Sequence, residues 1–284
     1  MGYRHIKNLY ADQTILMFKE CYAMEKIHGT SASISISNND LHFFSGGEKH
    51  EKFVELFDRE ALMQKFEEME LDNITFYGEA YGGKQQGMSH TYGKELRFIV
   101  FEVKIGDKWL DVPNAEMFAK NFGLEFVAYE KVSTDLAALD AERDRPSRQA
   151  KRNGILEDKK AEGVVLRPLI ELTKNNGERI ICKHKRADFS ETKTPIPVDP
   201  SKQKVLFEAK LIAEEWVTPM RLSHVLDKLG NPSDMSQTGN VIKAMIEDVQ
   251  RESEGFVAWN KDVEKAVGRK TVELYKAKVL KIEE

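Results

Sequence analysis

Lys26 is the residue of this sequence whose surroundings point most clearly to covalent chemistry. It lies within the stretch Glu25-Lys26-Ile27-His28-Gly29-Thr30, between a carboxylate and a glycine turn. A lysine amine attacks an electrophile at neutral pH only after losing its proton, and neighbouring cations or burial favour that loss. A lysine followed by glycine three residues later is a weak signal by itself, because a surface lysine before a turn gives the same pattern.

Three later stretches strengthen the case for Lys26. They are Tyr77-Gly78-Glu79, Ala161-Glu162-Gly163-Val164-Val165-Leu166-Arg167 and Cys182-Lys183-His184-Lys185. If the last stretch is a strand, Lys183 and Lys185 share one face and His184 lies on the other, because strand side chains alternate. The two lysines would then supply the positive field that activates the nucleophile, and the same pair would bind phosphate oxygens.

The composition is that of a globular protein with room for one or two domains. The chain has 284 residues, of which 41% are hydrophobic and 32% charged, and its net charge is −4. This acidic balance argues against non-specific coating of nucleic acid, although it allows a local basic groove. Cys21 and Cys182 lie far apart in apolar, strand-like runs, which predicts reduced cysteines in a cytosolic protein. No apolar run is long enough to predict a membrane span.

Apolar periodicity predicts a mixture of strands and helices before residue 190. The alternation from Ser31 to Ser37, the turn Asn38-Asn39-Asp40 and the return over residues 41–44 predict a hairpin. Further strands are expected in Thr14–Lys26 (one or two strands), Ile74–Tyr77, Leu96–Ile105, Glu162–Arg167 and Arg179–Lys185. Helices are expected in Lys49–Leu71, in Ala115–Phe122 and in Thr134–Arg152 with an interruption near Pro146.

A proline-rich segment divides the chain. Pro195, Pro197 and Pro200 lie among polar residues, a composition that continues neither a helix nor a central strand. The segments beyond it show helical spacing with few strand signals: Val205–Trp216, Arg221–Leu229, Asn240–Glu254 and Lys261–Leu280. We therefore predict an α+β domain of antiparallel sheets flanked by helices over residues 1–192, a linker over 193–204 and a small all-α domain over 205–284.

The ordered motifs resemble those of ATP-dependent RNA ligases of the phage-type RNA ligase 2 family, within the covalent nucleotidyltransferase superfamily. The resemblance spans nearly the whole chain. Its motifs are Lys26-Ile27-His28-Gly29, Gly78-Glu79, Phe98-Ile99-Val100-Phe101-Glu102, Glu162-Gly163-Val164-Val165 and Lys183-His184-Lys185. DNA ligases and capping enzymes usually have aspartate in place of His28 and an OB-fold in place of the C-terminal helices, so both features favour the RNA-joining branch.

The resemblance implies an adenylyltransferase domain and a three-step reaction. Lys26 would attack the α-phosphate of ATP to form a lysyl-adenylate, AMP would pass to an RNA 5′-phosphate, and a 3′-hydroxyl would displace AMP. Because each step is a displacement at phosphorus, positioning and electrostatics would do most of the work. The implied catalytic residues are Lys26, Glu162, Lys183 and Lys185, with Glu162 acting near the lysine or through Mg²⁺ or Mn²⁺.

The resemblance also implies binding residues. Glu79 would hold the ribose hydroxyls, Phe101 would stack on adenine, and the backbone around Glu25 would read the adenine edge. Further nucleotide contacts would come from Ile27, His28, Val165 and Arg167. His28 could instead brace the turn, and Arg167 could be an exposed arginine at a strand end. The residues implied for RNA ends are Ser31, Arg221, Asp248 and Glu252, and the last three could equally form an ordinary surface charge cluster.

The chain departs from the family pattern at two places. Phe44-Ser45-Gly46-Gly47 stands where the hairpin usually carries an arginine that contacts the nucleotide, so adenylylation would depend on Lys49 or another cation. Ser31 stands where asparagine is usual, and it offers the RNA 5′-phosphate a shorter donor.

Two other functions remain open from the sequence. One is another covalent nucleotidyltransferase, which seals DNA or transfers a cap. The other is a non-catalytic RNA-binding module that retains the fold, although binding alone requires no nucleophile. For a ligase, the expected partners are RNA ends, in a nicked duplex or a broken structured RNA. We also expect a monomer, no membrane association and a cytoplasmic location.

Overall fold

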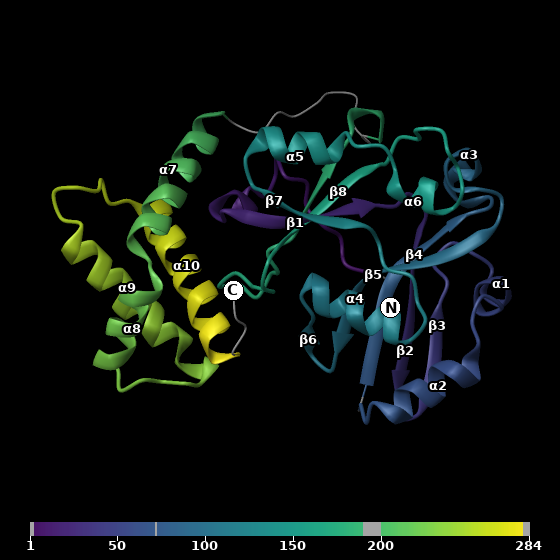
Figure 1. Cartoon of the computed structure of the whole chain (residues 1–284), viewed down its shortest axis with the longest axis horizontal. Coiled ribbons are helices and arrows are strands. Elements are labelled where there is room, and N and C mark those ends of the chain that lie inside the picture. The colour runs from purple at the N-terminus through teal and green to yellow at the C-terminus, as the bar shows by residue number, and fades with distance from the viewer. Residues whose placement is uncertain (1–2, 72, 190–199, 281–284) are drawn as a thin grey trace. The chain divides into compact units, whose positions relative to one another are not determined.

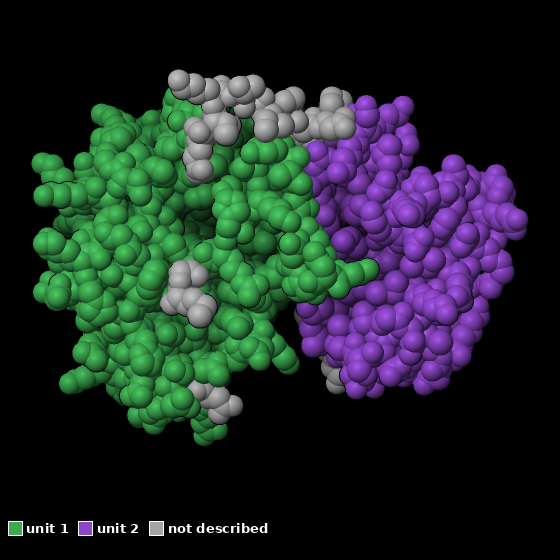
Figure 2. Space-filling view, turned by 180° about the vertical axis from the view of Figure 1, so that it is seen from behind, with its two compact units in different colours: residues 1–12, 20–195 green, residues 13–19, 196–284 purple. Residues whose placement is uncertain are grey.

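The computed structural model describes residues 3–71, 73–189 and 200–280, and the chain separates into two compact units (Figures 1 and 2). The first unit comprises residues 1–12 and 20–195, and the second comprises residues 13–19 and 196–284. The expected linker lies partly in 190–199, outside the described residues, whereas helix α7 already begins at Pro200. Proline is compatible with a helix start because its missing N–H would have no partner in the first turn.

Two antiparallel sheets form the framework of the first unit, which confirms the predicted α+β class. The strand orders are β3-β2-β4-β5-β6 and β7-β1-β8-β9. The strands are β1 (Glu20–Lys26), β2 (Thr30–Ser37), β3 (Asp40–Phe44), β4 (Asn73–Gly82), β5 (Leu96–Ile105), β6 (Lys108–Trp109), β7 (Tyr129–Ser133), β8 (Gly163–Pro168) and β9 (Cys182–Lys185). Since β1 and β2 belong to different sheets, residues 27–29 cross between the sheets directly after Lys26.

Short helices flank these sheets. They are α1 (His50–Val54), α2 (Arg59–Glu68), α3 (Ser89–Tyr92), α4 (Val112–Asn121), α5 (Leu136–Arg143) and α6 (Arg148–Arg152), with the 3-10 helices η2 (Gln85–Gly87) and η3 (Ala187–Phe189). The single helix expected over Lys49–Leu71 is wrong. Helix α1 ends at Val54, and Asp58, which has extended backbone and accepts a hydrogen bond from the Ala61 amide at 3.0 Å, caps the start of α2.

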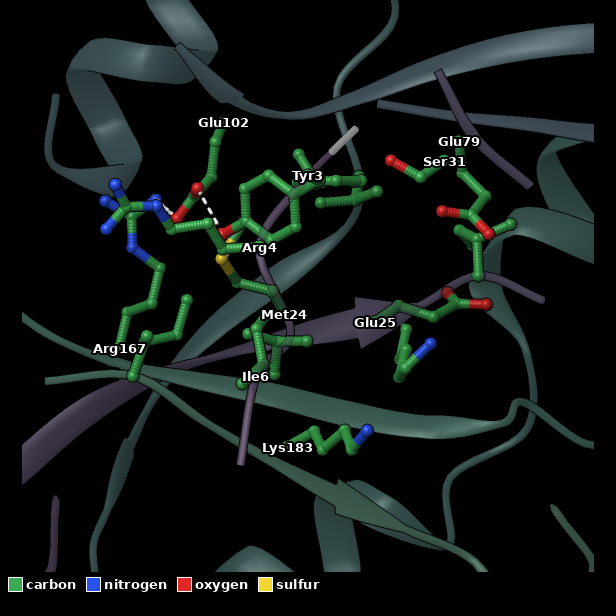
Figure 3. A pocket seen from close by; sticks show the side chains of 16 residues that line it. Tyr3, Arg4, Ile6, Met24, Glu25, Ser31, Glu79, Glu102, Arg167 and Lys183 are labelled. Carbon is green, nitrogen blue, oxygen red and sulfur yellow. Dashed lines mark hydrogen bonds and ion pairs between the residues drawn. The ribbon is translucent and has the colours of Figure 1, made fainter. Parts of the chain in front are cut away.

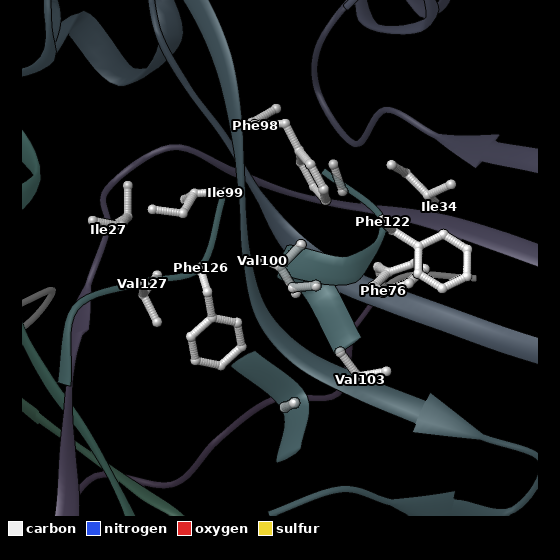
Figure 4. Close-up of a cluster of buried hydrophobic side chains, with 14 of the residues drawn as sticks. Ile27, Ile34, Phe76, Phe98, Ile99, Val100, Val103, Phe122, Phe126 and Val127 are labelled. Atoms are coloured by element: carbon white, nitrogen blue, oxygen red, sulfur yellow. The ribbon is translucent and has the colours of Figure 1, made fainter. Parts of the chain in front are cut away.

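Side chains of β4 and β5 contribute both to the core and to the pocket. Phe76 and Val100 are fully buried in the core, where Phe76 packs against Phe122 with ring centroids 4.8 Å apart (Figure 4). The register of β4 with β5 shifts between Tyr77 and Gly78, so that Phe101 is left without a paired residue. A β-bulge of this kind redirects side chains. As a result, the consecutive residues Phe101 and Glu102 both line the same pocket.

The second unit is helical throughout its described part. Its helices are α7 (Pro200–Trp216), α8 (Pro219–Lys228), α9 (Thr238–Glu252) and α10 (Lys261–Val279), with η1 (Thr14–Met17) and η4 (Met235–Gln237). Leu222, Met245 and Val267 are among its buried core residues. The expectation of a strand from residue 14 is wrong for η1, because Ile15 and Leu16 are buried in a 3-10 turn that contacts α7.

Among the described residues, no helix combines the length and apolar character needed to cross a membrane.

Candidate active site

Lys26 ends β1 and lies within a compact cluster of charged side chains. Its Nζ donates to Glu162 Oε2 at 2.9 Å, while Lys185 Nζ lies 2.8 Å from Glu162 Oε1. His28 Nδ1 lies 3.1 Å from Glu162 Oε2. The antiparallel register places Lys26 opposite Gly163 and Gly163 opposite Lys185. Three strands therefore bring together residues that are far apart in the sequence.

Glu162 is the electrostatic centre of this cluster. Its side chain is 2% exposed. Burial alone would raise its pKa, but the hydrogen bond with His28 and the charges of Lys26 and Lys185 lower the pKa of Glu162 to about 2. Glu162 is therefore a carboxylate at neutral pH, suited to orienting cations and unsuited to accepting a proton.

Gly163 allows β8 and β9 to meet directly beside Glu162. Its φ is +146°, and a Cβ atom there would lie 2.2 Å from the His184 carbonyl oxygen. Side chains with a Cβ are therefore excluded both by conformation and by space. The close packing of β8 against β9 therefore explains why the sequence motif has glycine directly after Glu162.

The structure confirms the predicted alternation in β9. Lys183 lines the pocket and Lys185 pairs with Glu162, whereas His184 Nε2 lies on the other side, 2.7 Å from Asp140 Oδ1 of α5. Lys183 is also positioned by the N-terminal segment, since its amide and carbonyl bond to the Lys7 carbonyl and the Leu9 amide, both at 2.9 Å.

A cavity of about 230 Å³ lies beside Lys26 (Figure 3). Figure 3 shows Ser31 and Glu79 at one end of this pocket and Glu102 and Arg167 at the other. The sequence-predicted residues that line it are Glu25, Lys26, Ile27, Ser31, Glu79, Phe101, Val165, Arg167 and Lys183. His28, Glu162 and Lys185 form the cluster around Lys26 instead.

Glu79 differs electrostatically from Glu162. Burial raises the pKa of Glu79 to about 7, although the charge of Lys26 and a hydrogen bond from the Gly29 amide at 3.1 Å oppose that rise. Near neutral pH this carboxyl is partly protonated, so it can both donate and accept hydrogen bonds. Such a group matches the paired hydroxyls of a ribose.

The pocket wall around Phe101 includes residues that the sequence did not single out. Tyr3 packs edge-on against Phe101, with ring centroids 5.0 Å apart, and its hydroxyl donates to Glu102 Oε2 at 2.5 Å. Arg179 donates to both oxygens of Glu102, at 2.6 and 2.8 Å. The N-terminal segment carries no strand or helix pattern, so no local signal would have identified Tyr3.

Of the two alternatives for Arg167, the exposed arginine at a strand end is wrong. Arg167 is 1% exposed, and its Nη2 donates to the Leu110 carbonyl at 2.5 Å and to Glu171 Oε2 at 2.7 Å. Its Nη1 lies 3.4 Å from Glu102 Oε1. Because the guanidinium is enclosed by these carboxylates, it contributes to the pocket wall as part of a buried network.

The loop that replaces the hairpin arginine folds back on the start of β2. Gly46 has φ +58°, and the Gly47 amide donates to Thr30 Oγ1 at 2.9 Å. Lys49, the cation expected to compensate, is exposed and precedes α1. The cations that line the pocket together with Lys26 are Arg4, Arg167 and Lys183.

A divalent cation would have one strong protein ligand here. No group of three or more His, Cys, Asp or Glu side chains forms a metal-binding cluster within the described residues. Mg²⁺ commonly uses one or two carboxylates and takes its other ligands from phosphates and water. The ionised Glu162 fits that requirement.

The residues implied for RNA ends in the C-terminal segment lie in the helical unit. Asp248 is 8% exposed and accepts from Arg221 Nη1 at 2.8 Å and from Lys228 Nζ at 3.0 Å. Arg251 also donates to Asp248, at 2.6 Å, and to Glu252, at 3.1 Å. The structure therefore joins Arg221 to Asp248 directly, while Glu252 is connected to Asp248 through Arg251.

The sheets and the pocket beside Lys26 define a nucleotidyltransferase fold of the RNA ligase type. The chain belongs to the RNA ligase family, since the family model described as RNA ligase matches residues 19–185. A search of curated proteins gave no match.

Solved structures of Naegleria gruberi RNA ligase share this fold. A variant with ATP and Mn is 13% identical, with a TM-score of 0.52 over 66% of this chain and 56% of that chain. A variant with AMP and Mn is 14% identical, with a TM-score of 0.52 over 68% and 58%. The structure with PPi is 14% identical, with a TM-score of 0.51 over 66% and 57%. The matched region thus spans little more than half of each relative.

Proposed function

We propose that this protein is an ATP-dependent RNA ligase that joins 3′-hydroxyl and 5′-phosphate RNA ends through a lysyl-AMP at Lys26. The observation that carries the proposal is the position of Lys26, which lines a cavity of about 230 Å³ and whose Nζ is oriented by Glu162 at 2.9 Å. Membership of the RNA ligase family and the likeness to structures with ATP or AMP and Mn support the choice of nucleotide and metal.

The positions of the residues in the pocket and in the cluster around Lys26 support the roles that we propose for them. Phe101 and Val165 lie on strands of the two different sheets and would hold the base between them, and Glu79 would bind the ribose. Lys183 and Lys185 would neutralise charge that develops on the α-phosphate as the Nζ–P bond forms and pyrophosphate leaves. Mg²⁺ or Mn²⁺ bound by Glu162 would add electrostatic stabilisation of the phosphates.

The RNA-joining steps extend the proposal to the other predicted residues. Ser31 lines the pocket at the end occupied by Glu79, where its hydroxyl could donate to a 5′-phosphate. Arg221, Asp248 and Glu252 would serve the RNA ends from the helical unit. A nicked duplex or a broken structured RNA would be the substrate, sealed by a monomeric, cytoplasmic enzyme.

The first test is covalent labelling with ATP that carries the label at its α-phosphate. We expect acid-stable label on the native protein with Mg²⁺ or Mn²⁺, and none on Lys26→Ala, because that variant lacks the nucleophile. Lys65→Ala is the matched control, since Lys65 is a surface lysine of α2 whose partner is Glu68. Absence of label on folded native protein free of bound AMP, with either metal, would refute the proposal and favour a non-catalytic binding module.

A substrate panel then separates ligation from related transfers. Nicked RNA, nicked DNA and diphosphate-ended RNA are supplied in turn to protein that takes the label. Sealing of nicked RNA in preference to the other two is the expected result. Preferential sealing of DNA, or transfer to the diphosphate end, would identify another covalent nucleotidyltransferase.

A further inference from the structure

The backbone on both sides of Lys26 is fixed by contacts that do not reach the pocket. The Glu25 amide donates to the Ala128 carbonyl at 2.8 Å, and the His28 amide donates to the Tyr92 hydroxyl at 3.3 Å. Residues 27–29 form the crossing between the two sheets. The nucleophile is therefore flanked by anchors, although no helix or continuous strand encloses it on its C-terminal side.

The side chain of Glu25 connects β1 to α6. Its carboxylate accepts from Ser147 Oγ at 2.5 Å, from the Arg148 amide at 2.9 Å and from the Gln149 amide at 3.1 Å. The two amides are backbone donors of the first turn of α6 that lack a partner within the helix, and a carboxylate satisfies such donors well. Although the residue lines the pocket, its charged oxygens are thus committed to α6.

Gln149 extends the connection from α6 to two buried tyrosines. It is fully buried, and its Nε2 lies 2.8 Å from the Tyr81 hydroxyl and 3.2 Å from Asn153 Oδ1. Asn153 Nδ2 in turn donates to the Tyr92 carbonyl at 2.9 Å. The rings of Tyr81 and Tyr92 meet edge to face, with centroids 5.3 Å apart.

These contacts form one continuous path. It runs from the Glu25 carboxyl group through Gln149 of α6 and Asn153, which directly follows α6, to Tyr92, whose hydroxyl accepts from the His28 amide. Both ends of the path lie within two residues of Lys26. Neither Gln149, Asn153 nor Tyr92 lines the cavity, so none of them is placed to bind the nucleotide.

We propose that α6 and Tyr92 form a positioning device for the nucleophile, in which Gln149, Asn153 and the Tyr92 hydroxyl hold the backbone around Lys26 at the attack geometry. This inference rests on the proposed function, because it concerns the reaction of Lys26 with ATP. Small displacements of a reacting group lower rates strongly, by about 100-fold for 1 Å in favourable cases. Binding of ATP would be affected less than the rate, since Glu79, Phe101 and Val165 line the pocket from other strands and stay in place.

The test is single-turnover adenylylation measured over a range of ATP concentrations. The variants are Tyr92→Phe, which removes one hydroxyl and retains the ring packing, and Gln149→Leu, which removes the amide. Both are expected to lower the maximal rate of labelling by about 10-fold and to leave the half-saturating ATP concentration nearly unchanged. Lys151→Ala is the matched control on α6, since Lys151 is exposed and pairs with Asp158 at the surface.

The double variant supplies a second criterion. If Tyr92 and Gln149 act through one path, the loss in the double variant is smaller than the product of the single losses. Maximal rates equal to that of Lys151→Ala would overturn the proposal. A change confined to the half-saturating ATP concentration would also overturn it, because that result would indicate ground-state binding.

Hydrogen exchange separates this proposal from the proposed function. In native protein the amides of residues 25–28 should be protected, and in Tyr92→Phe the His28 amide should exchange at least about 10-fold faster. Unchanged exchange at His28 would overturn the positioning device whether or not the protein takes label. Conversely, the His28 amide could exchange faster in Tyr92→Phe while the native protein takes no label. That result would support the positioning role of Tyr92 and refute only the ligase chemistry.

Discussion

At the scale of single residues, the two carboxyls nearest Lys26 have opposite electrostatic properties. The hydrogen bond with His28 and the neighbouring Lys26 and Lys185 lower the pKa of Glu162 to about 2, whereas burial raises the pKa of Glu79 to about 7. Glu162 stays ionised, whereas Glu79 gains a proton near neutral pH. Such a difference allows two chemically similar groups to have different roles in one site. Glu162 is then suited to orienting Lys26 or binding a metal ion, and Glu79 to exchanging hydrogen bonds with hydroxyls.

The raised pKa of Glu79 predicts a stability that depends on pH. A carboxyl with a folded-state pKa above its unfolded value of 4.5 stabilises the protein below pH 4.5, and that contribution is lost as pH rises towards 7. Between pH 5 and pH 8 the native protein should therefore lose up to about 3 kcal/mol relative to Glu79→Gln, which cannot ionise. Urea unfolding of both proteins at the two pH values measures this difference.

Glu60→Gln is the control for that experiment, because Glu60 is an exposed residue of α2. It should follow the native protein at both pH values. Identical pH dependence of the native protein and Glu79→Gln would show that Glu79 is ionised throughout this range.

At the scale of elements, the site depends on two irregularities in otherwise regular strands. The bulge in β5 turns Phe101 and Glu102 towards the same pocket, and Gly163 lets β8 approach the backbone of β9 beside Glu162. In both places local backbone geometry, and not the identity of the charged residue alone, determines where the functional side chain lies. The residues beside a functional residue in a motif therefore contribute to the site by fixing the backbone that positions it.

We expect Gly163→Ala to destabilise the protein by about 2 to 4 kcal/mol, since the added Cβ would lie 2.2 Å from a backbone oxygen at a φ of +146°. Labelling by ATP should fall as well, because Glu162 would be displaced. Urea unfolding and the labelling assay measure the two effects.

Gly239→Ala is the matched substitution for that comparison. Gly239 lies near the start of α9, and nothing lies within 4 Å of the position its Cβ would take. It should therefore be neutral or slightly stabilising. Equal stability of the two variants would mean that β8 and β9 can separate at Gly163 without cost.

At the scale of the whole molecule, the helical unit is discontinuous in sequence. Residues 13–19 group with residues 196–284, and Ile15 of η1 is 1% exposed. Residues 1–12 group with the sheets instead, where the Leu9 amide bonds to the Lys183 carbonyl. Leu9 and Ile15, two buried apolar residues of the N-terminal segment, thus belong to different units.

Hydrogen exchange of two alanine variants tests this division. Ile15→Ala should reduce the protection of α7, and Leu9→Ala should reduce that of β8 and β9, because each substitution removes buried contacts worth about 2 to 5 kcal/mol from one unit. The two variants serve as controls for each other. Loss of protection in the same elements in both would show that the units unfold as one.

Local patterns in the sequence determined much of the site. The hairpin of β2 and β3, the strand Leu96–Ile105, the shared face of Lys183 and Lys185 and the helical C-terminal segment all follow from side-chain periodicity or turn residues, which act over a few positions. The order of the motifs around Lys26 likewise indicated the family before any geometry was known.

Only the tertiary structure decided how distant segments meet. It buried Arg167 among carboxylates, brought Tyr3 against Phe101, committed the Glu25 carboxylate to α6 and assigned η1 to the helical unit. Apart from the pair of Arg167 with Glu171, which are four positions apart, these contacts leave no local signal, because they join residues separated by tens to hundreds of positions. Which residues form these contacts depends on the apolar faces and unpaired polar groups that the folded sheets leave available. Periodicity within one segment carries no information about those distant partners.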